Sequence, residues 1–302
     1  MGFAVVFSGQ GMQHADMLPW LADDALVEQT RSELGIDDWR ARLNDADWAA
    51  RNANAQVLLT GLNLAAWAQL SRGLPTPAAV AGYSVGELAS FAAAGVLDAS
   101  TALALAGTRA RAMDRCADMA PGGLLAVSGL APAQIGRLCT ESGAAIAIDN
   151  DSHAVVMGGP HAALETAQRA AEAAGAQCTR LKVNVASHTP WMRAAAAEFA
   201  QVLSTLPLRA PRMPLFSNAA DRITRGEQAA GALSRQIAQT VRWSACMDHI
   251  HMRRVGCVLE VGPGAALARM WNNRFQDVPA RSVDEFRSQA SIVAWVQRHS
   301  GD

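Results

Sequence analysis

A serine lies between two glycines in the segment Gly82-Tyr83-Ser84-Val85-Gly86. The apolar run AAVAG at residues 78–82 leads into it, and the helical pattern ELASFAAAG follows. A strand-to-helix turn with small neighbours lifts a serine hydroxyl clear of the sheet, and the helix N–H groups face the charge that develops there. This context predicts that Ser84 is a nucleophile, although the short pattern by itself also occurs by chance in Gly/Ala-rich chains.

A serine hydroxyl needs a base, and His188 is the histidine best placed to act as one. We expect it to follow a strand over LKVNV (residues 181–185), at a carboxyl end where the sites of α/β folds gather. Pro190 suits the first turn of a helix that starts at Trp191. A histidine that only caps this helix is the alternative. The other six histidines fall on expected loops, polar helix faces or the tail.

Short apolar runs alternate with long helical patterns along the chain. Residues 3–7, 78–82 and 257–261 are apolar runs that end near glycines, as strands buried on both faces do. Helical patterns such as residues 54–71 and 98–118 lie between them. This alternation predicts an α/β fold with a mostly parallel sheet, and residues 286–302 are expected to form a terminal helix.

One segment has a different order of elements. From Gly122 the sequence predicts a strand (LLAVSGL), a helix (132–142), two strands (AAIAID and HAVVMGG), a helix (161–174) and a strand (QCTRLKV). This βαββαβ order is that of a ferredoxin-like unit. We therefore predict a small inserted subdomain over residues 121–183, with residues 1–120 and 184–302 forming the catalytic domain.

The acid of a hydrolase-type triad has no obvious candidate. Asp149 and Asp151 fall inside the predicted small subdomain, and no other carboxylate between Ser84 and His188 lies at a predicted strand end. A Ser–His dyad oriented by a backbone carbonyl is therefore favoured over a full triad. The Gly9-Gln10-Gly11 turn after the first strand could present backbone N–H groups that form an oxyanion hole together with the Val85 N–H.

The composition fits a globular enzyme. The 302 residues are half apolar and carry a net charge of −1, which gives no support for nucleic acid as the main partner. Five scattered cysteines without C-x-x-C spacing predict free thiols, not a disulfide framework or a metal site. The start MGFAVVFSGQG lacks the basic region of a signal peptide, and polar residues interrupt the Ala-rich stretch 88–107. We expect a cytoplasmic protein without a membrane partner.

Several motifs occur in the order seen in malonyl-CoA:acyl carrier protein transacylases. They are F-S-G-Q-G-M-Q, G-Y-S-V-G-E, T-R-A-R-A-M, V-A-S-H-T-P-W-M and E-V-G-P-G. The chain resembles this family over nearly its whole length. The resemblance implies an α/β-hydrolase-like core with a ferredoxin-like insertion, which agrees with the organisation predicted above.

By this resemblance Ser84 is the nucleophile and His188 the base. The supporting roles fall on the oxyanion-hole amides of Gln10 and Val85, the backbone carbonyl of Gln236, which would orient His188, and Asn150, which would lie beside the acyl pocket. Tyr83 departs from the family pattern, because many relatives have histidine before the serine. The small residues of V-A-S-H leave room for a branched acyl chain as well as malonyl.

Arg109 corresponds to the family arginine that grips the free carboxylate of malonate. A planar guanidinium can hold a carboxylate through two parallel charge-assisted hydrogen bonds, which lysine cannot copy. Arg111 lies two residues on, so it points to nearly the opposite helix face. Without the motif, Arg109 as a surface residue of its helix would be the favoured interpretation.

The resemblance implies a ping-pong transfer of malonyl from malonyl-CoA to the pantetheine-type thiol of an acyl carrier protein. The CoA thioester is then a substrate, and no cofactor is bound permanently. The opening F-S-G-Q-G-M-Q-H-A-D-M-L and Tyr83 most resemble the acyltransferase (epsilon) subunit of malonate decarboxylase. A fatty-acid or polyketide transacylase is the alternative. A serine thioesterase is disfavoured by Arg109 and the missing acid, and a non-catalytic docking module by the intact catalytic positions.

Overall fold

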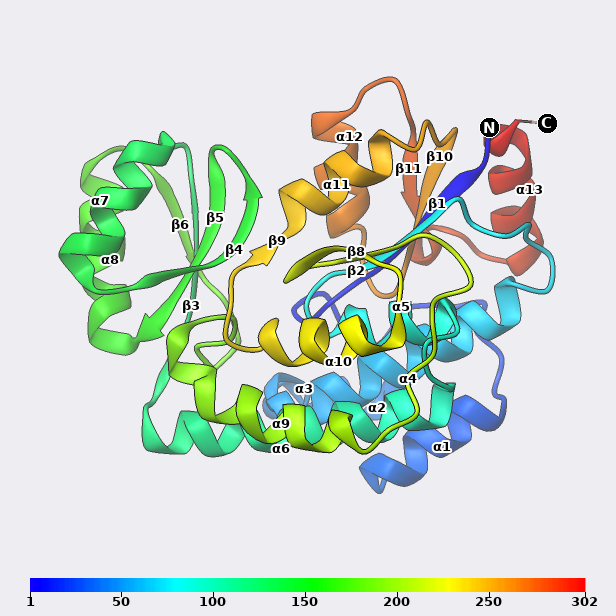
Figure 1. Ribbon diagram of the computed structural model, residues 1–302, viewed down its shortest axis with the longest axis horizontal. Coiled ribbons are helices and arrows are strands. Elements are labelled where there is room, and N and C mark those ends of the chain that lie inside the picture. The colour runs from blue at the N-terminus through cyan, green and yellow to red at the C-terminus, as the bar shows by residue number, and fades with distance from the viewer. Residues whose placement is uncertain (302) are drawn as a thin grey trace.

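The computed structural model describes residues 1–301, which form an α/β fold with two separate sheets (Figure 1). The larger sheet has six strands in the order β11-β10-β1-β2-β7-β8, and only β8 runs antiparallel to its neighbour. Its strands are β1 (Phe3–Phe7), β2 (Ala79–Gly82), β7 (Leu215–Ser217), β8 (Ala220–Ile223), β10 (Cys257–Val261) and β11 (Ala280–Ser282). Every residue of β1, β2 and β10 is buried, as continuous apolar runs in a covered parallel sheet require.

The register of the central strands brings three connecting segments to one edge of the sheet. Phe7 at the end of β1 lies opposite Gly82 of β2 on one side and Val261 of β10 on the other. Because the three parallel strands end at the same level, residues 8–18, 83–85 and 262–264 all leave the sheet at its carboxyl edge. The predicted nucleophile and the predicted oxyanion loop are therefore neighbours in space.

Helices cover the larger sheet. Helix α4 is buried along almost its whole length and packs against α1, α5 and α6, which explains why its sequence is apolar on all sides. The helices of this part are α1 (Ala25–Leu34), α2 (Trp39–Arg42), α3 (Ala46–Ala50), α4 (Asn52–Leu70), α5 (Gly86–Ala93), α6 (Ala99–Met119), α9 (Arg193–Ser204), α10 (Gly226–Arg235), α11 (Trp243–His251), α12 (Ala266–Arg274) and α13 (Gln289–Ser300).

The smaller sheet has the strand order β6-β3-β5-β4-β9 and forms the left-hand part of Figure 1. Its elements are β3 (Gly122–Ser128), α7 (Pro132–Ser142), β4 (Ala145–Asp151), β5 (Ala154–Pro160), α8 (His161–Ala173) and β6 (Gln177–Arg180), with β9 (Val241–Arg242) added from later in the chain. The first six follow the βαββαβ order predicted from the sequence. Helices α7 and α8 pack together and share with the sheet a separate hydrophobic core.

The predicted strand before His188 is wrong. Strand β6 ends at Arg180, and residues 181–189 form a loop. Val183 and Val185 are buried while Lys182 and Asn184 are exposed, so the alternation that predicted a strand reflects burial alone. Leu181 N–H still donates to the Leu124 carbonyl of β3, but later in the loop Ser187 N–H donates to the nearby Val185 carbonyl. The helix also begins differently from the prediction, with a 3₁₀ turn (Pro190–Met192) before α9.

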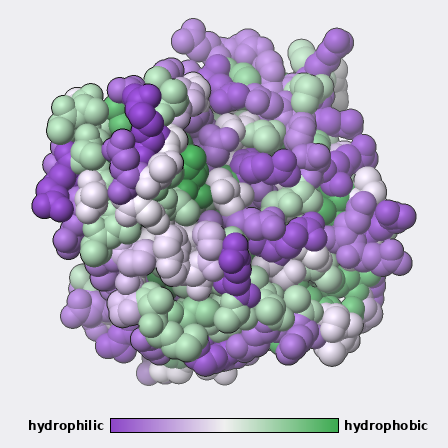
Figure 2. Space-filling model, turned by 60° about the vertical axis from the view of Figure 1, so that its left-hand side comes forward, coloured by the Kyte–Doolittle hydropathy of each residue, from purple (hydrophilic) through white to green (hydrophobic). Residues whose placement is uncertain are grey.

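The Ala-rich stretch 88–107 divides between α5 and α6, with Asp98 capping α6 through the Thr101 N–H at 2.8 Å. Among residues 1–301, no helix combines the length and the apolarity that a bilayer crossing needs. Hydrophilic and apolar residues are interspersed over the face shown in Figure 2, where strongly hydrophobic colour is confined to small areas.

Candidate active site

Ser84 occupies a sharp turn between β2 and α5. Its φ of 54° lies in the left-handed region, which costs a non-glycine residue about 1 kcal/mol or more. The flanking glycines are required by close backbone contacts: a Cβ at Gly82 would lie 2.2 Å from the Gly86 carbonyl carbon, and one at Gly86 would lie 2.3 Å from the Phe7 carbonyl oxygen. The sequence pattern of small residues around the serine is thus explained by packing against β1 and against the turn itself.

Asn218, which the sequence analysis missed, ties both sides of this turn together. Its Oδ1 accepts from Ser84 N–H at 2.9 Å, and its Nδ2 donates to the Gly82 carbonyl at 2.8 Å. Its own N–H donates to Glu87 Oε1 at 2.5 Å. Asn218 is completely buried directly after β7, the strand next to β2. The side chain therefore satisfies the backbone groups of a strained turn that has no regular partner for them.

His188 lies beside the serine in the orientation that a base needs. Its Nε2 is 2.7 Å from Ser84 Oγ, and its Nδ1 is 2.6 Å from the Gln236 carbonyl oxygen. Because a carbonyl can only accept, the proton must sit on Nδ1, which leaves the Nε2 lone pair to accept from the serine hydroxyl. The histidine is itself in the left-handed region, with φ 63°, and its N–H donates to the Ile237 carbonyl at 2.8 Å. This geometry is the one that the predicted Ser–His dyad requires.

His188 is uncharged at neutral pH. Burial lowers its pKa, and the positive charge of Arg109 lowers it further, to about 3, against the opposing effect of the hydrogen bond to Gln236. A neutral imidazole is the form that can take a proton from serine.

The loop after β1 touches the turn at Ser84. A Cβ at Gly9 would lie 2.7 Å from the Tyr83 carbonyl oxygen, so the two backbones approach closely. Within residues 1–301, no hydrogen bond uses the N–H of Gln10 or of Val85. Both of the amides that the sequence analysis singled out for the oxyanion hole are thus unpaired donors.

Arg109 is buried, 2% exposed, and is held by neutral groups. Its Nη1 donates to Gln56 Oε1 at 2.6 Å, and its Nη2 donates to Gln236 Oε1 at 2.8 Å. Burial lowers its pKa to about 10, partly offset by the carboxyl group of Glu87, so the guanidinium is still a cation at neutral pH. A buried cation whose direct partners are uncharged amides is suited to bind an anionic ligand.

Gln236 contacts the three principal residues of the site at once. Its carbonyl accepts from His188, its Oε1 accepts from Arg109, and its Nε2 donates to the Ser84 carbonyl at 2.5 Å. The sequence analysis assigned it only the first contact. Its side chain, buried at 1% exposure, also fixes the position of the guanidinium relative to the nucleophile.

Gln56 and Glu87 are further polar residues that the sequence analysis missed. Gln56 is fully buried in α4 and donates from Nε2 to Asn52 Oδ1 at 2.6 Å, which orients its Oε1 toward Arg109. Glu87 is buried in the first turn of α5, and burial raises its pKa to about 7. A buried polar side chain in an otherwise apolar helix is the sequence signal for both.

Asn150 lies where the smaller sheet meets the turn at Ser84. Its Oδ1 accepts from the Tyr83 hydroxyl at 3.1 Å, and the Tyr83 ring packs edge-on against Trp243 at 5.3 Å between centroids. Burial raises the pKa of Tyr83 well above its usual value, so this hydroxyl is a donor. Asp149, the neighbouring residue, accepts from Ser244 Oγ at 2.7 Å and does not contact His188.

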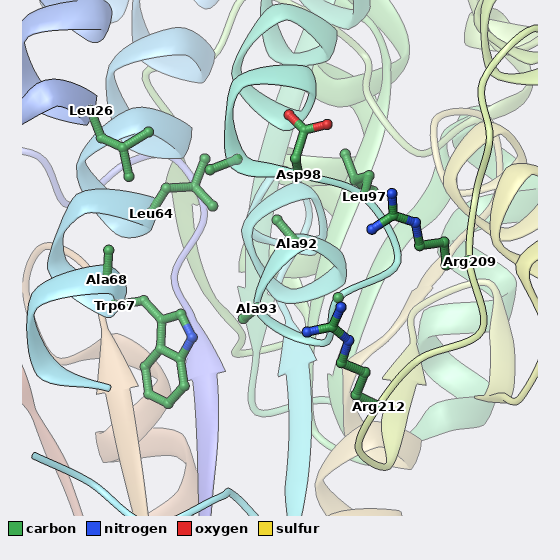
Figure 3. Close-up of a pocket in the computed structure, with 12 residues that line it drawn as sticks. Leu26, Leu64, Trp67, Ala68, Ala92, Ala93, Leu97, Asp98, Arg209 and Arg212 are labelled. Carbon is green, nitrogen blue, oxygen red and sulfur yellow. The ribbon is translucent and has the colours of Figure 1, made fainter. Parts of the chain in front are cut away.

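A cavity of about 310 Å³ lies away from this site, between α4 and the far end of α5 (Figure 3). Leu26, Leu64, Trp67 and small residues line it, and Arg209 and Arg212 lie at one side. None of the residues that the sequence analysis selected for chemistry contributes to this lining. The geometry around Ser84 therefore defines the candidate active site.

Comparison with known proteins agrees with this geometry. A family model described as an acyl transferase domain matches residues 4–302. The malonyl CoA-acyl carrier protein transacylase of Escherichia coli strain K12 is 31% identical over 306 residues, which cover 96% of this chain and 98% of that protein.

Solved structures of similar proteins have the same fold. An acyl-carrier-protein S-malonyltransferase from Burkholderia pseudomallei superposes with a TM-score of 0.89 at 29% identity, covering 97% of this chain and all of the other. A malonyl-transacylase in complex with its type II PKS acyl-carrier protein gives a TM-score of 0.90 at 30% identity, covering 97% of this chain and 99% of that one. By its whole-length match, the chain belongs to the malonyl-CoA:acyl carrier protein transacylase family, as the order of its motifs predicted.

Proposed function

We propose that this enzyme transfers a malonyl group from malonyl-CoA to the pantetheine-type thiol of an acyl carrier protein, through an ester on Ser84. The observation that carries the proposal is the position of Gln236, which joins a nucleophile, a neutral base and a buried cation in one hydrogen-bonded set. Ser84 and His188 can cleave a thioester by nucleophilic attack, and Arg109 can bind a carboxylate at the far end of the acyl group.

The first half-reaction forms the acyl-enzyme. His188 Nε2 takes the proton of Ser84 Oγ as the oxygen attacks the thioester carbonyl carbon. The Gln10 and Val85 N–H groups face the tetrahedral oxyanion, whose negative charge such unpaired donors stabilise. The C–S bond then breaks, and the proton on Nε2 passes to the departing CoA sulfur.

The second half-reaction runs the same path in reverse. The carrier thiol gives its proton to His188 Nε2 and attacks the ester carbonyl, and the Ser84 oxygen recovers the proton as it leaves. Arg109 holds the malonyl carboxylate throughout.

The bound carboxylate also acts on the base. Arg109 lowers the pKa of His188, so an anion on the guanidinium offsets this effect and makes the imidazole a stronger base. A carboxylate-bearing acyl group thereby assists the reaction of its own thioester, which acetyl cannot do.

We propose the carrier subunit of malonate decarboxylase as the acceptor. The opening F-S-G-Q-G-M-Q-H-A-D-M-L and Tyr83 support this choice, because they most resemble the acyltransferase subunit of that system. A fatty-acid or polyketide carrier is the second candidate, which the likeness to a malonyl-transacylase in complex with a type II PKS acyl-carrier protein favours.

We also propose a domain organisation for the chain. We assign residues 1–120 and 184–302 to an α/β-hydrolase-like catalytic domain and residues 121–183 to a ferredoxin-like subdomain. The βαββαβ order of β3 to β6 supports the second assignment. A cytoplasmic location, where thiols stay reduced, is supported by the five cysteines, which are all unpaired.

The test is a transfer assay with malonyl-CoA and each purified carrier protein bearing its thiol arm. We expect malonyl-carrier thioester and free CoA in equal amounts, with the malonate decarboxylase carrier acylated fastest. Release of free malonate faster than carrier acylation would indicate a thioesterase. A protein that neither reacts with malonyl-CoA nor is labelled by a serine-directed probe would indicate a docking module.

A further inference from the structure

Two loops at the carboxyl edge of the larger sheet meet beside the oxyanion donors. Residues 8–18 follow β1, include Gln10, and contain neither helix nor strand. Residues 262–264 follow β10, the strand next to β1. Backbone bonding of this loop to the sheet stops at Ser8, whose N–H donates to the Val261 carbonyl at 3.0 Å, so the rest of the loop relies on side-chain contacts for its position.

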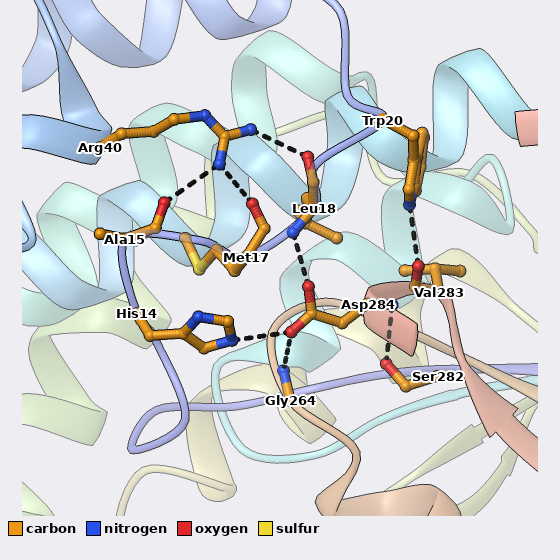
Figure 4. Close-up of polar contacts among 10 residues, drawn as sticks. All are labelled: His14, Ala15, Met17, Leu18, Trp20, Arg40, Gly264, Ser282, Val283 and Asp284. Atoms are coloured by element: carbon orange, nitrogen blue, oxygen red, sulfur yellow. Dashed lines mark hydrogen bonds and ion pairs between the residues drawn. The ribbon is translucent and has the colours of Figure 1, made fainter. Parts of the chain in front are cut away.

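Asp284 makes three of these contacts (Figure 4). Its Oδ1 accepts from Leu18 N–H at 2.6 Å, and its Oδ2 accepts from His14 Nε2 at 2.8 Å and from Gly264 N–H at 2.7 Å. The carboxylate lies in the short 3₁₀ turn Val283–Glu285, after β11, and its side chain is only 7% exposed. One buried carboxylate thus joins the loop after β1 to the loop after β10.

Leu18 is held in a strained conformation by this network. It is one of four non-glycine residues in the left-handed region among residues 1–301, with φ 50°, and Ser84 and His188 are two of the others. Arg40 holds the other side of the peptide: its Nη2 donates to the Leu18 carbonyl at 2.9 Å and its Nη1 to the Met17 carbonyl at 2.5 Å (Figure 4). Such strain persists only where neighbouring groups enforce it.

The two loops also pack against each other next to Gln10. Gly264 has φ 68°, and a Cβ there would lie 2.9 Å from Met12 Cε. Met12 is two residues from Gln10. Asp284 therefore binds the loop after β10 at Gly264, the residue that packs against the oxyanion loop.

We propose that Asp284 is a positioning residue for acyl transfer: by joining the two loops, it holds the Gln10 N–H toward the oxyanion. It does not touch the reacting atoms. The proposal rests on the proposed function of Ser84 and Gln10, and it assigns the control of oxyanion geometry to a carboxylate near the carboxyl end of the chain.

The expected effect follows from the role. A displaced oxyanion donor lowers transition-state stabilisation without changing substrate binding, so kcat falls and KM stays nearly constant. Asp284→Ala removes all three contacts, and we expect kcat to fall by about 10- to 100-fold. Asp284→Asn keeps an acceptor for Leu18 N–H, so its loss should be smaller, although the amide nitrogen in place of Oδ2 can accept from neither Gly264 nor His14. The factor should be the same for malonyl-CoA and acetyl-CoA, because the carboxylate site is untouched.

The matched control is Asp277→Asn. Asp277 also pairs with a histidine, His251, at 3.2 Å, but this pair is on the surface and does not contact the loops. We expect wild-type kcat and KM for this variant.

Hydrogen–deuterium exchange separates positioning from general destabilisation. For Asp284→Ala and Asp284→Asn we expect faster exchange in residues 9–18 and 262–264, with protection of β2 and α4 unchanged. Unchanged kcat in both variants, a loss confined to malonyl-CoA, or faster exchange throughout the protein would overturn the proposal. A wild-type enzyme that transfers no acyl group would instead refute the proposed function, and the exchange pattern would still report on the loops.

Discussion

Arg109 and Arg274 show two ways in which this protein accommodates a guanidinium. Arg274, on the surface of α12, is bound by the carboxylate of Asp248, whose two oxygens both accept from Nη2 at 2.7 Å. Arg109 is buried, yet the groups it touches are the neutral amide oxygens of Gln56 and Gln236. The exposed arginine is paired with a carboxylate, whereas the buried one has no carboxylate among its hydrogen-bond partners, as its proposed role requires.

The histidines repeat this contrast. His251 pairs with Asp277 near the surface, but His188 pairs with the Gln236 carbonyl in the interior. A carboxylate in the place of the Gln236 carbonyl would lie close to Arg109. Its negative charge would attract the guanidinium in competition with an anionic substrate. The neutral carbonyl orients the base without placing a negative charge beside the guanidinium, as the proposed role of Arg109 requires. The lack of a triad acid and the proposed binding of a carboxylate by Arg109 are therefore consistent with one arrangement.

The largest effects should come from the dyad. Ser84→Ala removes the nucleophile and His188→Ala the base, and each should reduce transfer by at least about 10³-fold. His251→Ala, which removes the exposed histidine, should leave kcat within about 2-fold of wild type. Steady-state rates of malonyl-carrier formation check this, with circular dichroism to show that each variant is folded. A His188→Ala enzyme with near-normal kcat would remove the imidazole from the mechanism.

Replacing the two arginines tests the comparison directly. Arg109→Ala removes a pair of charge-assisted hydrogen bonds to the malonyl carboxylate, so we expect kcat/KM for malonyl-CoA to fall by about 10²- to 10³-fold. The loss with acetyl-CoA should be much smaller. Arg274→Ala should leave kcat/KM unchanged for both malonyl-CoA and acetyl-CoA, although it breaks the ion pair with Asp248. Equal losses on the two substrates with Arg109→Ala would contradict the carboxylate-binding role.

The pH profile is the next test. Because the pKa of His188 is lowered to about 3, the base stays deprotonated at mildly acidic pH. We expect kcat/KM for acetyl-CoA to show no acid limb near the ordinary histidine pKa of about 6.5. In Arg109→Ala the lost positive charge raises the pKa of His188, so the acid limb should move toward higher pH. A wild-type limb centred near pH 6.5 would show that the imidazole is not buried as described.

The smallest effect concerns Glu87 and the stability of the fold. Burial raises its pKa to about 7 from the unfolded value of 4.5, so the folded state binds the proton more tightly. The contribution of Glu87 to the free energy of unfolding then decreases as pH rises from 4.5 to about 7. Glu87→Gln should remove this contribution, whereas the similar one from buried Glu260, whose pKa is also raised to about 7, remains. Urea denaturation of both proteins at several pH values measures it. Glu198→Gln, at an exposed carboxylate paired with Arg115, is the control and should match wild type in this window.

Local patterns in the sequence were enough to predict the turn that carries Ser84, the buried strands β1, β2 and β10, and the order of elements in the smaller sheet. The glycines at 82 and 86 and the runs FAVVF and CVLEV report on packing within a few residues, which is why they could be interpreted without coordinates. His188 was predicted from its own sequence context, whereas the family resemblance supplied the selection of Arg109, Gln236 and Asn150. The structure places all four near the turn at Ser84.

Contacts between distant segments could not be predicted in this way. Asn218 is 134 residues from Ser84, and no periodicity marks the hydrogen bond that joins them. Asp284 is likewise 266 residues from Leu18. The loop before His188 misled the prediction for a related reason, because Val183 and Val185 alternate in burial without pairing to a strand. Side-chain burial is visible in a sequence, whereas the partner of a backbone group is not.

The most direct test of the account is the identity of the acyl-enzyme. The purified protein is mixed with malonyl-CoA in the absence of a carrier, quenched in acid, digested and analysed by mass spectrometry. The account predicts a malonyl ester on Ser84 alone, formed in wild type and nearly lost in Arg109→Ala, whereas acetyl-CoA labels both proteins to a similar extent. A malonyl group on any other residue, or equal malonyl labelling of the two proteins, would contradict it.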